Sequence, residues 1–216
     1  MDNLKGKRVL ITAGPTHEPI DPVRFISNYS SGKMGIAIAE EAAQNGAIVT
    51  LVCGPSSVKS SNTITRIDVK TAQQMYDSVM KEEGAHDILI LSAAVADYRP
   101  KLVAENKIKK KDAKLVIELE PTPDILASLG AVKRDNQFLV GFALETDNEV
   151  ENAQGKLQKK NCDLIVLNSL QDAGAGFGHD TNKVSILDQH NNISTFELKS
   201  KSGVAIDILQ TISQYL

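Results

Sequence analysis

Ile26-Ser27-Asn28-Tyr29-Ser30-Ser31-Gly32-Lys33-Met34-Gly35 is the stretch from which the organisation of this chain can be read. It is polar, small and rich in glycine, and it runs into an apolar segment at 36–43 that has the composition of a helix and stops at Asn45-Gly46. The stretch is therefore predicted to be a loop that leads into a helix N-terminus. Free backbone N–H groups and the helix dipole favour an anion there, so the loop is predicted to bind phosphate.

The common phosphate-binding motifs do not match this loop. A Walker loop needs glycine five places before its Gly-Lys pair and serine or threonine after it, where this chain has Ser27 and Met34. The dinucleotide fingerprint also fails, because Gly14 at the end of the first predicted strand has no close glycine partners. A phosphate loop of a less common kind is the interpretation that remains.

The flanking sequence alternates between short apolar runs and helical patterns. Strands are predicted at 7–12, 48–52, 63–69, 87–91, 138–143 and 163–167, and helices at 36–43, 71–83 and 147–160. This alternation predicts an α/β fold: a doubly wound, Rossmann-like, mostly parallel sheet with helices on both faces. Ligands bind beyond the carboxyl ends of such strands, which places Gly14, Gly54 and residues 93–97 at one cleft with the loop.

The later sequence predicts additions to this sheet. Residues 99–114 are rich in lysine and are predicted to form a mobile flap, followed by a strand at 115–119. Thr122 is expected to cap a helix with Pro123 at its first position. Residues 183–198 predict an antiparallel hairpin, and residues 202–216 a closing helix. No linker is evident, so residues 1–216 are predicted to form a single domain.

The composition of the 216 residues excludes several classes of protein. Aromatic residues make up 4% and the net charge is −3, which argues against a nucleic-acid partner. No apolar run approaches the ~20 residues that span a bilayer, and no signal pattern opens the chain, so a cytoplasmic enzyme without a membrane partner is expected. Cys53 and Cys162 are expected to be buried, reduced thiols, and the four histidines lack the spacing of a zinc site.

One longer run carries a family resemblance. From Ile11 to Gly35 the sequence reads ITAGPTHEPIDPVRFISNYSSGKMG, which resembles the bacterial phosphopantothenate–cysteine ligases, also called phosphopantothenoylcysteine synthetases. The resemblance extends over nearly the whole chain and departs at Tyr29, where the family often has arginine or histidine. In many bacteria this ligase is the C-terminal half of a bifunctional coenzyme A biosynthesis protein.

The resemblance implies a two-step reaction. The carboxylate of 4′-phosphopantothenate attacks the α-phosphate of CTP, giving an acyl-cytidylate and pyrophosphate. The amine of L-cysteine then attacks the acyl carbonyl and releases CMP. Mg²⁺ is expected with CTP, its protein ligands are unknown, and no flavin is expected in this chain. A homodimer is also implied, with the hairpin at 183–198 as one candidate for the contact.

The resemblance further implies roles for particular residues. Asn28 and Lys107 are the catalytic candidates, and Asn28 and Ala94 would hold the acyl substrate. The nucleotide would bind Ser30, Ser31, Gly32, Lys33, Met34, Gly35, Leu91, Ser92, Ala93, Asp97, Lys107, Pro123, Asp124, Ile125, Leu126, Phe142, Lys156 and Lys160. Without the resemblance, Asn28 would be interpreted as an ordinary turn residue and Asp97 as a capping residue at a plain strand end. The lysines would be interpreted as solvated.

Two other classes of function stay open on the residues alone. A NAD(P)-binding Rossmann-type reductase would share the first strand and helix, and a nucleotide-sensing regulatory domain would bind without turnover. The sequence also leaves open whether the ligase stands alone or is fused to a phosphopantothenoylcysteine decarboxylase half. The preference for CTP over ATP rests on the resemblance.

Overall fold

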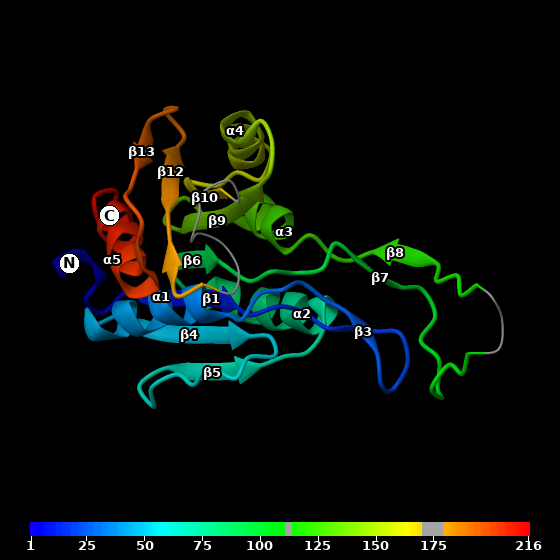
Figure 1. Ribbon diagram of the computed structural model, residues 1–216. Helices are drawn as coiled ribbons and strands as arrows, with labels where there is room; N and C mark the ends of the chain where they lie inside the picture. The colour runs from blue at the N-terminus through cyan, green and yellow to red at the C-terminus, as the bar shows by residue number, and fades with distance from the viewer. Residues whose placement is uncertain (111–113, 170–178) are drawn as a thin grey trace.

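The computed structural model describes residues 1–110, 114–169 and 179–216. Its centre is an eight-stranded sheet in the order β13-β12-β10-β9-β6-β1-β4-β5 (Figure 1). The strands are β1 (Arg8–Ala13), β4 (Ile48–Cys53), β5 (Thr65–Asp68), β6 (Ile88–Leu91), β9 (Phe138–Glu145), β10 (Leu164–Ser169), β12 (Val184–Asp188) and β13 (Ile193–Thr195). The strands from β5 to β10 run parallel, and β12 and β13 add an antiparallel edge. The predicted fold class and the C-terminal hairpin are confirmed.

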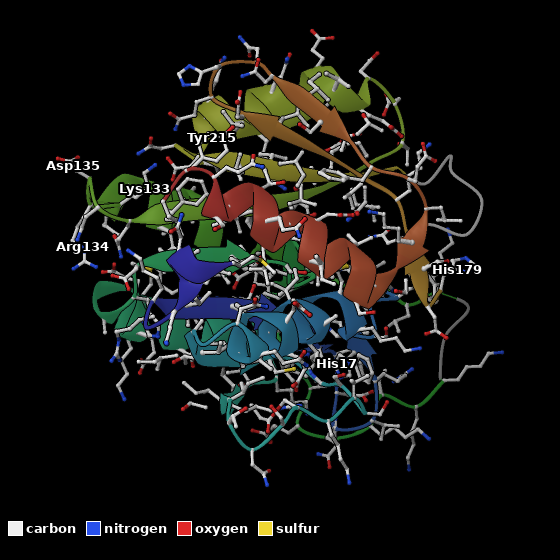
Figure 2. The ribbon with its side chains drawn as sticks, turned by 90° about the vertical axis from the view of Figure 1, so that its left-hand side faces the viewer. His17, Lys133, Arg134, Asp135, His179 and Tyr215 are labelled. Carbon is white, nitrogen blue, oxygen red and sulfur yellow. The ribbon has the colours of Figure 1, made fainter. Side chains whose placement is uncertain are left out.

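Helices cover both faces of the sheet. α1 (Lys33–Gln44) and α5 (Lys201–Ser213) lie side by side on one face (Figure 2), and α2 (Ala72–Glu82), α3 (Ile125–Val132) and α4 (Glu149–Lys159) cover the other. Successive side chains of β1 point to opposite faces of the sheet, and both faces carry apolar residues. Val9 and Ile11 belong to the apolar core under α1 and α5, and Leu10 belongs to the core under α2 to α4. Both faces are buried, as the continuous apolar runs of the central strands require.

Short two-stranded ribbons and 3-10 turns complete the described structure. The ribbons pair β2 (Glu18–Pro19) with β3 (Phe25–Ile26), β7 (Tyr98–Pro100) with β8 (Leu119–Pro121), and β11 (Thr181–Asn182) with β14 (Lys199–Ser200). The 3-10 turns are η1 (Asp2–Leu4) and η2 (Glu83–Ala85). The β7–β8 ribbon and the described residues that connect its strands, 98–110 and 114–121, form an arm that projects from the body (Figure 1).

The arm corrects one predicted strand. Residues 115–118 have no regular structure, and the strand expected there starts only at Leu119. The reason is that β8 pairs solely with β7, which is three residues long, from Tyr98 to Pro100. The predicted mobility of the flap at 99–114 stays a prediction, and its residues 111–113 lie outside the described residues.

The helix ends confirm one predicted cap and correct another. The capping box of Thr71 and Gln74 at the start of α2 is confirmed. The cap predicted at Thr122 is wrong: the Asp124 carboxylate caps α3 by accepting from the N–H of Ala127 at 2.8 Å. Thr122 Oγ1 instead donates to the carbonyl oxygen of Ala96 at 2.6 Å, so its hydroxyl is committed to a distant segment.

No helix in the described part of the chain is both long enough and apolar enough to cross a membrane. The eight main strands form one sheet. That all of residues 1–216 fold as one domain stays a prediction.

Candidate functional site

The candidate site lies where the strand order reverses. β1 pairs with β4 on one side and with β6 on the other. The chain first adds β4 and β5 on one side of β1, and then crosses to add β6, β9 and β10 on the other side. Connections that diverge at such a switch point leave a crevice beyond the carboxyl ends of the strands. Here the segments after β1 and β6 also meet, because Ala94 N donates to Gly14 O at 2.9 Å and pairs in parallel with Pro15.

Two threonine hydroxyls hold the segment that follows β6. Thr12 Oγ1 accepts from the backbone N–H of Ala93 at 3.1 Å, and Thr16 Oγ1 accepts from the N–H of Ala96 at 3.0 Å. Both threonines are buried, Thr16 completely. Hydrogen bonds in such a dry position hold the backbone of 93–96 firmly against the loop after β1.

Asn28 ties the same segment to the polar loop. Its Nδ2 donates to the carbonyl oxygens of Ala94 at 3.0 Å and Val95 at 3.2 Å, and the residue itself is exposed at the mouth of the crevice. The two amide hydrogens are thus committed to backbone in this structure. Donation from Asn28 to a substrate carboxylate, the predicted role, requires one of these bonds to open.

The predicted loop enters α1 in the expected way, with the helix starting three residues earlier. Gly32 is the N-cap with φ of 80°, a left-handed conformation that glycine adopts without steric cost, and no side chain caps the helix. A Cβ at Gly35 would lie 2.7 Å from Ala13 Cβ and 2.8 Å from Thr12 O. The first turn of α1 therefore packs directly on the end of β1, with its N-terminus open to the crevice.

Two adjoining cavities occupy the crevice, one of about 270 Å³ and one of about 450 Å³. Of the predicted residues, the first cavity is lined by Asn28, Ser30, Ser31, Gly32, Lys33, Met34, Gly35, Ser92, Ala93, Ala94, Asp97, Phe142 and Lys156. The second is lined by Leu91, Ala93, Asp97, Pro123, Asp124, Ile125, Leu126, Phe142, Lys156 and Lys160. Their shared wall includes Ala93, Asp97, Phe142 and Lys156, so the predicted positions other than Lys107 line one continuous crevice.

Lys107 is the predicted residue that this structure does not bring to the cavities. It is exposed and lines neither of them. The neighbouring backbone is held elsewhere, because Ala104 N donates to Ile20 O at 3.0 Å and Ile108 N donates to Asp21 Oδ2 at 3.1 Å. The flap is fastened to the β2–β3 ribbon, and a role for Lys107 in the site stays a prediction.

The second cavity has its own ionic contacts. Lys156 Nζ donates to Phe142 O at 2.6 Å, and Lys160 Nζ pairs with Asp124 Oδ2 at 2.5 Å. Partial burial alone would raise the pKa of Asp124, but the hydrogen bonds from Lys160 and from the helix N–H of Ala127 outweigh it and lower that pKa. The two lysines lie one turn apart at the end of α4 and face the same cavity, as their spacing predicts.

The first cavity also contains residues that the sequence did not single out. Lys201, Asn168 and Asn182 line it, and Asn182 Nδ2 donates to Asn168 Oδ1 at 2.8 Å. Burial, together with the positive charge of Lys33, lowers the pKa of Lys201 against the opposing effect of Asp180. Asn168 follows the apolar part of a strand, a position that could have marked it. Lys201 carries no local signal.

The cysteines take no part in this geometry. Cys53 and Cys162 are buried and free, as predicted, and neither lines a cavity of the crevice. Burial raises the pKa of Cys162 to about 12 and also raises that of Cys53, so both thiols stay protonated at neutral pH. Within residues 1–110, 114–169 and 179–216, no three His, Cys, Asp or Glu side chains gather as metal ligands.

Comparison with known proteins gives consistent matches over the whole chain. Residues 4–216 match the family model of the DNA/pantothenate metabolism flavoprotein C-terminal domain. The coenzyme A biosynthesis bifunctional protein CoaBC of Vibrio cholerae is 46% identical over 99% of this chain and 54% of its own length. The crystal structure of the C-terminal domain of CoaBC superposes with a TM-score of 0.85 at 43% identity, covering 100% of this chain and 98% of that one.

A further curated relative bears a different name. A protein called Cysteine/Cysteine sulfinic acid decarboxylase, from an unknown prokaryotic organism, is 57% identical over 97% of this chain and 58% of its own length. The chain therefore spans little more than half of these curated relatives. The rest of each of these relatives lies outside the matched stretch.

Proposed function

Because this chain belongs to the family of the DNA/pantothenate metabolism flavoprotein C-terminal domain, we propose that it is a phosphopantothenate–cysteine ligase of coenzyme A biosynthesis. It joins 4′-phosphopantothenate to L-cysteine and cleaves CTP to CMP and pyrophosphate through an acyl-cytidylate. One observation carries the proposal. The positions that the resemblance implies for nucleotide and substrate, spread from Asn28 to Lys160, line two cavities with a common wall, with Lys107 as the exception.

The two cavities suggest a division of the substrates. The second cavity has an apolar lining from Ile125 and Leu126, with polar backbone at Pro121 and Thr122, which suits a nucleoside. The first cavity has Asn28 and the open N-terminus of α1, which suit phosphate and carboxylate groups. The reacting α-phosphate would lie at the common wall, beside Asp97 and Lys156.

Charge is the main obstacle to the first step, because two anionic substrates must approach each other. Lys33, Lys156 and the N-terminus of α1 offset that repulsion, and they stabilise the negative charge that develops on pyrophosphate. Mg²⁺ would arrive on the triphosphate and neutralise part of its charge. Mg²⁺ commonly takes only one or two protein carboxylates beside phosphate oxygens, a requirement that Asp97 on the common wall can meet.

In the second step the amine of cysteine displaces CMP from the acyl carbonyl. Neither Cys53 nor Cys162 supplies the sulfur, since that cysteine is a substrate. The mixed anhydride must also be kept from water, and the lysine-rich flap with Lys107 would cover the crevice for this purpose. In this structure Lys107 lies outside, so the covering position requires the flap to move.

The partners are proposed with the activity. A homodimer is expected, and the arm is a better candidate for its contact than the hairpin at 183–198. Large apolar side chains stand exposed on the arm, with Leu102 at 83% and Val116 at 87%, whereas Ile193 of the hairpin is 44% exposed. A fused phosphopantothenoylcysteine decarboxylase half, absence of flavin from this chain and a cytoplasmic location complete the proposal.

The decisive experiment measures pyrophosphate release by the purified chain with 4′-phosphopantothenate and Mg²⁺. CTP is compared with ATP, with and without L-cysteine. Release that requires phosphopantothenate and prefers CTP, with phosphopantothenoylcysteine formed when cysteine is present, is the expected result. Absence of release from folded protein would contradict the proposal. Titration with NADPH tests a reductase, and CO₂ release from cysteine or cysteine sulfinic acid tests the activity in the other relative's name.

A further inference from the structure

Lys201 lines the first cavity, although it is not among the residues predicted to bind nucleotide or substrate. It is the first residue of α5, and together with Lys33, the first residue of α1, it lines the first cavity but not the second. The chain thus directs the starts of two neighbouring helices and two lysines at one end of the site. Figure 2 shows α1 and α5 side by side, with His179 next to the start of α5.

The Lys201 residue is mostly buried, and no carboxylate among the described residues pairs with its ammonium group. The residue is 9% exposed, and its Nζ donates to the carbonyl oxygen of His179 at 2.6 Å. Among the residues that the structure describes, no acidic side chain lies within ion-pair distance of this nitrogen. Burial of a cation beside the second cation of Lys33 is unfavourable unless an anion compensates it.

The neighbouring groups leave room for such an anion. Lys33 Nζ pairs with Asp180 at 2.5 Å, but the Asp180 side chain is 85% exposed, and an exposed ion pair of this kind opens readily in water. Gly32 leaves the N-terminus of α1 without a side-chain cap, whereas Ser200 caps α5 through Gly203 N. Of the acidic residues, Asp97 lines the same cavity, at the wall it shares with the second.

We propose that Lys201, with Lys33, binds a phosphate group in the first cavity and thereby positions a substrate of the ligase. This inference rests on the proposed function, which supplies two phosphate-bearing ligands. The group is either the terminal phosphates of CTP, which leave as pyrophosphate, or the phosphate of 4′-phosphopantothenate. Both have the same chemistry, a multiply charged oxyanion that accepts hydrogen bonds from an ammonium group.

Binding of single ligands separates these sources without turnover. Dissociation constants for CTP, pyrophosphate and 4′-phosphopantothenate are measured by calorimetry on wild type and on Lys201→Met. Loss of one hydrogen-bonded charge pair weakens binding by about 10- to 100-fold. Weaker CTP and pyrophosphate binding identifies the nucleotide phosphates, and weaker phosphopantothenate binding alone identifies the substrate phosphate. Either result supports the proposal.

Matched variants make the test decisive. Lys159→Met removes an exposed lysine of α4 that lines neither cavity, and it should bind all three ligands as wild type does. Lys201→Arg keeps the charge and should restore part of the affinity. Lys33→Met, at a side chain that is 40% exposed, repeats the test if Lys201→Met fails to fold.

The result that overturns the proposal is wild-type affinity for every ligand in a folded Lys201→Met protein, or in Lys33→Met if that protein alone folds. A wild-type protein that binds none of the three ligands would instead refute the proposed function itself.

Discussion

The side-chain amide of Asn28 joins two segments that lie 66 residues apart, by donating to Ala94 O at 3.0 Å. Its second bond, to Val95 O at 3.2 Å, completes a clamp between the loop before α1 and the segment after β6. Both segments line the first cavity. A substitution at position 28 therefore changes the wall of the site as well as any contact with the substrate.

Asn28→Asp should be more damaging than Asn28→Ala. The aspartate would turn a carboxylate oxygen toward two carbonyl oxygens and push residues 94–95 away, whereas alanine only removes the clamp. Because a misplacement of about 1 Å can cost about 100-fold in rate, we expect a loss of that size for Asn28→Asp. Initial rates of pyrophosphate release provide the measurement. Equal rates for the two variants would show that repulsion at the clamp plays no part.

Gly35→Ala tests the close contact between α1 and β1. The added methyl group would lie 2.7 Å from Ala13 Cβ, so the helix must shift, and overpacking of this kind costs about 1–3 kcal/mol of unfolding free energy. Urea denaturation measures the change. Gly155→Ala in α4 is the matched control, because nothing lies within 4 Å of its added Cβ and alanine should stabilise the helix by about 0.5–1 kcal/mol. Equal effects at both sites would contradict the contact.

The sequence predicted those features that depend on local patterns. An apolar run such as 48–52 indicates an inner strand, because a strand buried on both faces is made of consecutive apolar residues. Thr71 and Gln74 indicate a helix start, because the groups that form the capping box are only three residues apart. The polar loop could likewise be placed at a helix N-terminus, since glycine and lysine before an apolar segment carry that signal. The order of the strands then brought the loop and residues 93–97 together.

Features decided by distant partners could not be predicted in this way. Thr122 and Asp124 are both good capping residues, and the choice falls on Asp124 because the Thr122 hydroxyl donates to Ala96 O, 26 residues away. Lys201 reaches the first cavity only because α5 packs beside α1, a contact between the two ends of the chain. The position of Lys107 depends on Asp21 in the same way, 87 residues before its neighbour Ile108.

Replacing both cysteines by alanine should leave the ligase rate unchanged. Cys53 and Cys162 are buried away from the two cavities, and the sulfur of the product comes from free cysteine. Loss of each sulfur atom should lower the free energy of unfolding by roughly 0.5–3 kcal/mol. Rates and urea denaturation measure the two effects separately. Loss of rate in a folded double variant would place a thiol in the reaction.

Asp21 fastens the flap through a buried carboxylate. Arg24 pairs with this carboxylate and donates through Nη2 to Ile108 O at 3.0 Å, while Ile108 N donates to Asp21 Oδ2 at 3.1 Å. Because the flap must leave this position to cover the crevice, Asp21→Asn should release residues 104–108 and raise kcat, and the walls of both cavities should stay intact because no part of this latch lines them. Asp68→Asn, which loses an exposed pair with Arg66, is the control and should keep the wild-type kcat.

The latch also predicts a dependence of stability on pH. The hydrogen bond from Arg24, followed by those from the backbone, holds the pKa of Asp21 well below its ordinary value of 3.8, against the effect of desolvation. A carboxyl whose pKa is lowered by folding stabilises the protein fully above its unfolded pKa, and this stabilisation is lost as the pH falls further. The difference in Tm between wild type and Asp21→Asn should thus be constant near neutral pH and shrink below about pH 4. A difference that grows on acidification would show that Asp21 is protonated in the folded protein, and that the latch is not an ion pair.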